Sequence, residues 1–273
     1  MLAIVADSGV YLTEREAKSL GVRMIPMSYA VDGRRFVESY GGENGDYAAL
    51  FQGARQLTTE PGAATAFRLV FEDLLERGFE VLCVVISSRL SGSCRSARQA
   101  AQQTNPDRVK VVDSLAGIGI MEFLVRRARE LADRDLGVQE IARELERFRD
   151  TCGLCFSVED MAALRRSGRM SLVRQSVGTV LNIRPILRMS GGAIVSVGTA
   201  RGRSEQAKLL ARQIPPEARE VILTHFGPES QITELRRQVE ELHPNLALRV
   251  KDGGPVLTIH LGVGCNAASW RTE

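Results

Sequence analysis

The stretch Val81-Leu82-Cys83-Val84-Val85-Ile86-Ser87-Ser88-Arg89-Leu90-Ser91-Gly92-Ser93 decides how this chain folds. Its apolar first half is typical of a strand buried inside a parallel sheet. The segment that follows, Cys94–Gln103, has the composition of a helix. A strand therefore passes into a helix through a turn with five serine or glycine positions. Backbone N–H groups converge at such a turn and hold an anion, and serine hydroxyls add further donors. An ordinary capped turn without a ligand is the alternative that stays open here.

Strands and helices alternate on both sides of this turn. The alternation of buried strands with amphipathic helices is typical of a doubly wound parallel sheet. The predicted strands are Leu2–Ala6, Val22–Ala30, Val81–Ile86 and Val109–Val112. The predicted helices are Asp46–Gln52, Ala64–Arg77, Cys94–Gln103, Ile118–Asp133 and Val138–Arg149. Residues 1–150 are therefore expected to form an N-terminal α/β domain that contains the anion-binding turn.

The pattern changes near residue 150. Ser190-Gly191-Gly192 is a hairpin signal between two predicted strands, which a purely parallel sheet would lack. Strands are predicted at Leu154–Val158, Ile183–Met189, Ala193–Thr199, Glu220–Thr224, Leu246–Lys251 and Val256–Ile259. Helices are predicted at Glu159–Arg166, Ser204–Gln213 and Ser230–His243. Residues 151–273 are therefore expected to form a second, mixed α/β domain, so the fold class is α/β with two domains.

Composition bounds the class of protein. The 273 residues are 44% hydrophobic and 25% charged, as in soluble globular proteins, and the net charge is only +3. Such mild charge, without basic runs, argues against nucleic acid as a partner. No apolar run approaches the roughly 20 residues that a membrane-spanning helix needs. Because the first residues lead straight into a strand without a signal-peptide pattern, the expected location is the cytoplasm.

The common catalytic signatures are absent. The chain has no GxxxxGK[ST], GxSxG or HExxH motif, and the GxGxxA-like Gly262–Ala267 lacks a following acidic strand end. The remaining candidates are polar residues at the ends of predicted elements: Thr58–Pro61, Ser91–Ser93 and His260, which follows the predicted strand Val256–Ile259. Hydroxyls, free N–H groups and an imidazole suit a carboxylate head group. The same set suits a nucleophilic serine with a histidine base, so both readings stay open.

Several motifs, in this order along the chain, resemble those of the DegV family of fatty-acid-binding proteins, which serve bacterial fatty acid kinase. The resemblance covers essentially the whole sequence. The matching segments are Ile4–Ser8, Thr58–Pro61, Ile86–Ser93, Val112–Ser114, Ser167–Ser171, Asn182–Leu187 and His260–Gly264. Together they are far more specific than any one of them alone.

The resemblance implies a protein that holds one long-chain fatty acid between its two domains. In the family, residues matching Thr58, Ser91 and His260 hold the carboxylate, and Gly92 and Ser93 of the same serine-rich turn are expected to bind it as well. The acyl chain would lie in an apolar tunnel. The implied protein needs no cofactor or metal and has no catalytic residues of its own.

The resemblance also implies a protein partner. Arg169 and Arg201 match family arginines associated with engaging an ATP-dependent kinase subunit. That kinase transfers the γ-phosphate of ATP to the bound carboxylate and forms an acyl phosphate. Transient contact with a membrane surface fits this role. A serine-dependent acyl hydrolase and a carrier of another amphiphilic lipid are the alternative functions.

The sequence departs from the family pattern in the stretch Gly9–Tyr11 and at Glu60, Gly62, Ser93 and Val263. Glu60 matters most, because a carboxylate beside an anion site is repulsive unless it points away. The departures leave Thr58, Ser91 and His260 untouched.

Overall fold

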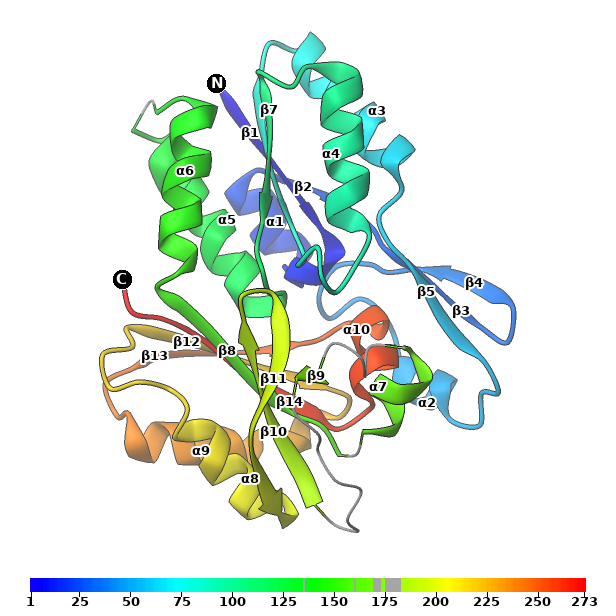
Figure 1. Ribbon diagram of the computed structural model, residues 1–273, viewed down its shortest axis with the longest axis vertical. Helices are drawn as coiled ribbons and strands as arrows, with labels where there is room; N and C mark the ends of the chain where they lie inside the picture. The colour runs from blue at the N-terminus through cyan, green and yellow to red at the C-terminus, as the bar shows by residue number, and fades with distance from the viewer. Residues whose placement is uncertain (135, 160, 169–172, 175–182) are drawn as a thin grey trace.

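The computed structural model describes residues 1–134, 136–159, 161–168, 173–174 and 183–273. Its strands form three sheets, and two of them dominate the molecule. In Figure 1 the sheet built from the N-terminal half occupies the upper part and the sheet from the C-terminal half the lower part. No helix within the described ranges is both long and apolar enough to cross a lipid bilayer.

The first sheet is parallel throughout and has the strand order β2-β1-β6-β7. Its strands are β1 (Leu2–Asp7), β2 (Val22–Ile25), β6 (Glu80–Val85) and β7 (Val109–Asp113). Its helices are α1 (Glu14–Leu20), α3 (Ala64–Glu76), α4 (Ser93–Thr104), α5 (Ile118–Ala132) and α6 (Val138–Arg149). The helices α3 and α4 pack on one face, while α5 and α6 pack on the other. The predicted doubly wound parallel sheet is therefore confirmed.

The second sheet is mixed and has the order β13-β12-β14-β8-β10-β11-β9. Its strands are β8 (Cys152–Ser157), β9 (Val173–Arg174), β10 (Ile183–Ser190), β11 (Ala193–Arg201), β12 (Glu220–Phe226), β13 (Ala247–Asp252) and β14 (Cys265–Arg271). The helices α8 (Gly202–Ala211) and α9 (Thr233–Leu242) cover one face. The hairpin predicted at Ser190–Gly192 joins β10 to β11. Strand β14, which the sequence pattern missed, pairs with both β12 and β8 in the middle of the sheet.

The predicted strand Val22–Ala30 is wrong in one respect, because it is two strands in two sheets. It divides at Pro26, whose missing N–H cannot continue a ladder. After the break, β3 (Ser28–Val31) pairs with β4 (Arg34–Val37) and with β5 (Leu57–Glu60) to form a small antiparallel sheet. The short helix α2 (Tyr47–Phe51) lies between β4 and β5 in the chain.

The predicted strand Val256–Ile259 is also wrong, since these residues belong to the helix α10 (Pro255–Leu261). Pro255 stands in the first turn, where the absence of its N–H costs nothing. Gly254 is the N-cap, and its carbonyl accepts a hydrogen bond from the Thr258 N–H at 3.2 Å. His260 therefore lies in the last turn of a helix rather than after a strand.

The two halves of the chain share one hydrophobic core. A single cluster of buried side chains includes Ile4 and Leu124 from the N-terminal half and Phe156 and Ile222 from the C-terminal half. Helix α5 joins the two halves, because it contacts β1 and β6 of the first sheet as well as β8, β12 and β14 of the second. The carboxyl ends of the parallel strands are thereby brought against the face of the second sheet.

Candidate functional site

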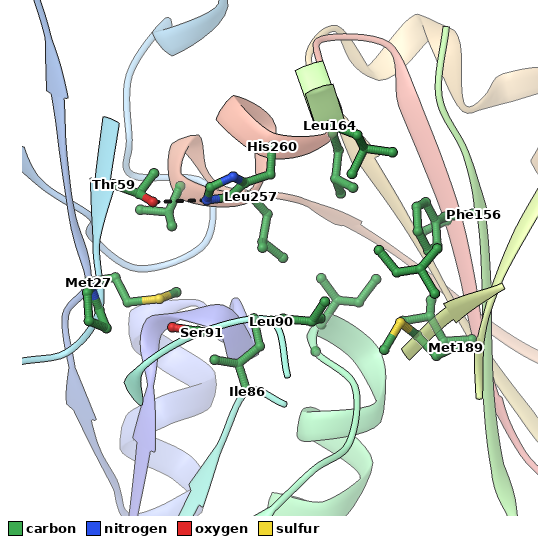
Figure 2. Close-up of a pocket in the computed structure, with 18 of the residues that line it drawn as sticks. Met27, Thr59, Ile86, Leu90, Ser91, Phe156, Leu164, Met189, Leu257 and His260 are labelled. Atoms are coloured by element: carbon green, nitrogen blue, oxygen red, sulfur yellow. Dashed lines mark hydrogen bonds between the residues drawn. The ribbon is translucent and has the colours of Figure 1, made fainter. Parts of the chain in front are cut away.

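A deep cavity lies where the carboxyl end of the parallel sheet meets the second sheet, beneath α10 (Figure 2). It encloses about 850 Å³ of empty space, counting its opening to solvent. Its walls are mostly apolar side chains, among them Met27, Ile86, Leu90, Phe156, Met189 and Leu257. Ligands of open α/β sheets commonly bind beyond the carboxyl ends of the strands, so the position and lining mark this cavity as the candidate site.

Polar groups gather at one end of the cavity. Figure 2 shows the Thr59 hydroxyl, the His260 ring and the Ser91 hydroxyl toward one side, with Phe156 and Met189 toward the other. The Thr59 Oγ1 and the His260 Nε2 are 2.9 Å apart and share a hydrogen bond. This distribution fits a molecule with a small polar head and a long apolar body.

The structure corrects the threonine of the predicted site. Thr58 is exposed and does not line the cavity, whereas Thr59 is half-buried and does. Both residues belong to β5, where successive side chains point to opposite faces of the sheet. Only the face of β5 that carries Thr59 is turned toward α10, so the polar contact to His260 belongs to Thr59.

The serine-rich turn carries three residues of the cavity wall, Leu90, Ser91 and Gly92. The backbone N–H groups of Leu90 and Ser91 both donate to the Ser87 carbonyl, at 2.9 and 3.1 Å, which closes the turn before α4 begins. These bonds present the Ser91 hydroxyl at the mouth of the cavity. The structure places Ser91, Gly92 and His260, three of the predicted site residues, around one cavity.

Ser93 has a different position from its neighbours in the turn. Its side chain is fully buried and does not line the cavity. Its hydroxyl lies 3.3 Å from the Ser91 hydroxyl and accepts a hydrogen bond from the Gly62 N–H at 3.2 Å. Ser93 thus links the turn to the loop after β5, and its hydroxyl contacts the Ser91 hydroxyl.

Two buried carboxyl groups, those of Asp7 and Glu38, lie next to the site without lining the cavity. The sequence did not predict them as a pair. Asp7 is 0% exposed and accepts hydrogen bonds from the N–H groups of Gly9 and Ile86, at 3.1 and 3.0 Å. Glu38 is 1% exposed and accepts from the Ser8 hydroxyl at 2.6 Å and from the Val256 N–H at 2.9 Å. Glu38 thereby holds the first turn of α10, the helix that carries His260.

Burial raises the pKa of both carboxyl groups. Removal from water raises the pKa of Asp7 to about 7, against the opposing effect of its backbone hydrogen bonds. Burial likewise raises the pKa of Glu38 to about 7, and the nearby Asp7 charge adds to this effect. No motif pointed to Glu38, because its chain neighbours carry no recognisable pattern and its partners are distant in sequence.

Glu60 lines the opening of the cavity, but its carboxylate is engaged elsewhere. It accepts a hydrogen bond from the Ser28 hydroxyl at 3.2 Å and forms an ion pair with Arg35. These contacts draw the charge toward the small antiparallel sheet. A Cβ at position 62 would lie 2.8 Å from the Phe67 ring, so a serine would be crowded at Gly62.

Two arginines, Arg169 and Arg201, are predicted to engage a partner, and Arg201 does not line the cavity. Arg169 lies outside the described residues. Arg201 is exposed at the end of β11, and its backbone N–H donates to the Glu205 carboxylate at the start of α8. Within the described part of the chain, no group of three or more His, Cys, Asp or Glu side chains is placed to hold a metal ion.

A family model described as "Uncharacterised protein, DegV family" matches residues 1–273, the whole chain. The chain belongs to the DegV family. A DegV domain-containing protein of Deinococcus radiodurans is 32% identical over 277 residues, which cover 96% of this chain and 95% of the relative. The family resemblance inferred from the motifs is therefore confirmed.

Solved DegV structures share the fold. A fatty-acid-binding DegV family protein from Thermus thermophilus is 28% identical, with a TM-score of 0.85 and 99% of each chain covered. The B3 protein of Streptococcus pneumoniae fatty acid kinase, loaded with linoleic acid, is 18% identical, with a TM-score of 0.83 and 100% of each chain covered. The likeness to this second protein extends over the complete DegV architecture.

Proposed function

We propose that this protein binds one long-chain fatty acid in its cavity and presents the carboxylate to a kinase. The observation that carries the proposal is the division of one cavity into an apolar body and a polar end that holds Thr59, Ser91 and His260. The Thermus thermophilus relative that binds fatty acid and the Streptococcus pneumoniae kinase subunit loaded with linoleic acid support it.

The polar end suits a carboxylate. A buried carboxylate is costly unless several donors satisfy its oxygens. The hydroxyls of Thr59 and Ser91 and a ring N–H of His260 are such donors, because each can turn toward one anionic group. The described lining contains neither lysine nor arginine, so the head group would be held by hydrogen bonds rather than by a salt bridge.

The apolar walls suit an acyl chain. Each methylene removed from water contributes about 0.8 kcal/mol, so a long chain binds tightly through its area alone. Phe156 and Met189 line the cavity away from the polar end, whereas Met27 lies nearer to it (Figure 2). Methionine side chains are flexible and adapt to the bends of an acyl chain.

The reaction would take place on the bound carboxylate. One carboxylate oxygen attacks the terminal phosphorus of ATP, a new O–P bond forms, and the bond to the ADP oxygen breaks with its electron pair leaving on ADP. ATP and the residues that activate it would come from the kinase, since this chain has no phosphate-binding GxxxxGK[ST] motif. Arg169 and Arg201 are the proposed contacts to that kinase.

Mass spectrometry of the organic extract from purified protein tests the proposal, because a stoichiometric fatty acid is expected. Titration of the delipidated protein then tests the site. Ser91→Ala and Thr59→Ala should each weaken fatty acid binding by about ten- to a hundred-fold, the effect of one hydrogen bond to a charged group. Thr58→Ala is the matched control and should bind as the wild type does. A clean extract and no binding on titration would refute the proposed function.

A further inference from the structure

A second hollow adjoins the polar end of the cavity. It runs along the exposed side of α4 and shares Ser91 and Gly92 with the cavity wall. Its other lining residues are polar or charged: Ser88, Arg95, Arg98, Gln99 and Gln102. We call this hollow the α4 groove. It begins where the acyl cavity ends.

The α4 groove carries positive charge, and its lining contains no acidic residue. Arg95 and Arg98 are exposed and lie one turn apart on α4, which contains no acidic residue. Among the residues that the structure describes, neither guanidinium forms an ion pair. Arg95 also stands in the first turn of α4, where the helix dipole disfavours a cation. Helix stability therefore does not account for its position.

The charge distinguishes the α4 groove from the cavity beside it. The cavity lining has no arginine or lysine, which suits a carboxylate held by hydroxyls and an imidazole. An acyl phosphate extends further, because one carboxylate oxygen carries a phosphoryl group, which brings at least one additional negative charge. The cationic groups of the α4 groove, which adjoins the cavity at Ser91 and Gly92, are those of Arg95 and Arg98. Guanidinium groups match phosphate oxygens in a bidentate geometry.

We propose that the α4 groove binds the phosphoryl group of an acyl phosphate whose acyl chain fills the cavity. This inference rests on the proposed function and adds to it a site for the product. Arg95 and Arg98 would hold the phosphoryl oxygens, and the amides of Gln99 and Gln102 would add donors. The same two arginines would offset the charge that builds up when the carboxylate and the terminal phosphate of ATP approach each other.

Hexadecyl phosphate is the probe for this site. It has the same C–O–P linkage as hexadecanoyl phosphate but lacks the carbonyl that makes the acyl phosphate hydrolyse. Delipidated protein is titrated with hexadecyl phosphate and, separately, with hexadecanoic acid. In the double variant Arg95→Gln/Arg98→Gln, the dissociation constant for hexadecyl phosphate should rise by at least about ten-fold. The constant for hexadecanoic acid should stay within about two-fold of the wild type.

The matched control is Arg143→Gln/Arg212→Gln, which removes the same charge from exposed positions that line neither hollow. It should change neither affinity, and equal melting temperatures for all variants will show that they fold alike. An unchanged affinity for hexadecyl phosphate in the Arg95/Arg98 variant, or an equal loss for both ligands, would overturn the inference alone. Failure of hexadecanoic acid to bind the wild type would instead overturn the proposed function, and the inference with it.

Discussion

At the scale of single residues, the site depends on buried acids that touch no ligand. Asp7 fixes the backbone at Gly9 and Ile86, and Glu38 fixes the start of α10. Neither side chain lines the cavity. Two carboxyl groups without a cation between them are a costly arrangement, and proteins reduce this cost by keeping one or both protonated. The site is thus supported by groups whose charge depends on pH.

This arrangement predicts the direction in which stability varies with pH. The pKa of Asp7 rises from 3.8 to about 7 and that of Glu38 from 4.5 to about 7, so the folded chain retains protons that the unfolded chain has lost. The free energy of unfolding should therefore fall as pH rises from about 4 to about 7, and level off above that. Urea denaturation at a series of pH values measures this change in the free energy of unfolding.

Asp7→Asn provides the control for this assignment. It should make the slope of the free energy of unfolding against pH less negative by up to about 1.4 kcal/mol per pH unit, because one of the two proton-binding groups is gone. The variant will be less stable overall, since an amide cannot replace both carboxylate acceptors. A slope identical to that of the wild type would show that Asp7 is not the group responsible.

At the scale of elements, the helix α10 positions His260 through its contacts at the N-terminus. Gly254 precedes Pro255 and lies against the Glu38 carboxylate and the Tyr11 ring, so any Cβ there overlaps both groups. Glu38 then accepts the Val256 N–H, one of the free donors at the start of the helix. A sequence pattern of four apolar residues does not distinguish a short strand from a short buried helix, and these contacts decide it.

Gly254→Ala should lower the free energy of unfolding by about 1–3 kcal/mol, because the added methyl group forces Glu38 and Tyr11 to move. Gly137→Ala is the matched control. Gly137 is also an N-cap glycine, before α6, but a Cβ there meets no atom within 4 Å. Its effect should stay below about 1 kcal/mol, because only the poorer capping of alanine contributes. Chemical denaturation of both variants decides between these expectations, and equal effects would contradict this account of α10.

At the scale of the whole molecule, an ion-pair network joins the two halves. Glu122 of α5 is 0% exposed and lies 2.7 Å from Arg126 on the same helix. It also pairs with Arg249 and Lys251 on β13 of the second sheet. This cluster and the shared hydrophobic core hold the cavity walls, which come from both halves, in one arrangement.

Glu122→Gln should therefore destabilise the protein by about 3 kcal/mol, because it leaves neighbouring cations without their buried carboxylate. The loss should appear in one cooperative transition, since both halves share a core. Glu130→Gln is the control, because Glu130 pairs with Arg127 on the exposed side of the same helix. Its effect should be under about 1 kcal/mol. Calorimetry that shows two separate transitions would contradict the single core.

The sequence by itself determined the parallel sheet, the serine-rich turn and the family. These features depend on local periodicity and short motifs, as in Val138–Arg149, where the predicted helix has the observed bounds. Four features needed the tertiary structure. Which of Thr58 and Thr59 faces the cavity depends on the side of β5 that α10 covers, and a four-residue strand does not encode that side. The Asp7–Glu38 pair and the position of β14 bring together residues far apart in the chain, and only packing sets such distances. The α4 groove is lined by one continuous stretch, residues 88–102, but only the tertiary structure shows that it adjoins the cavity.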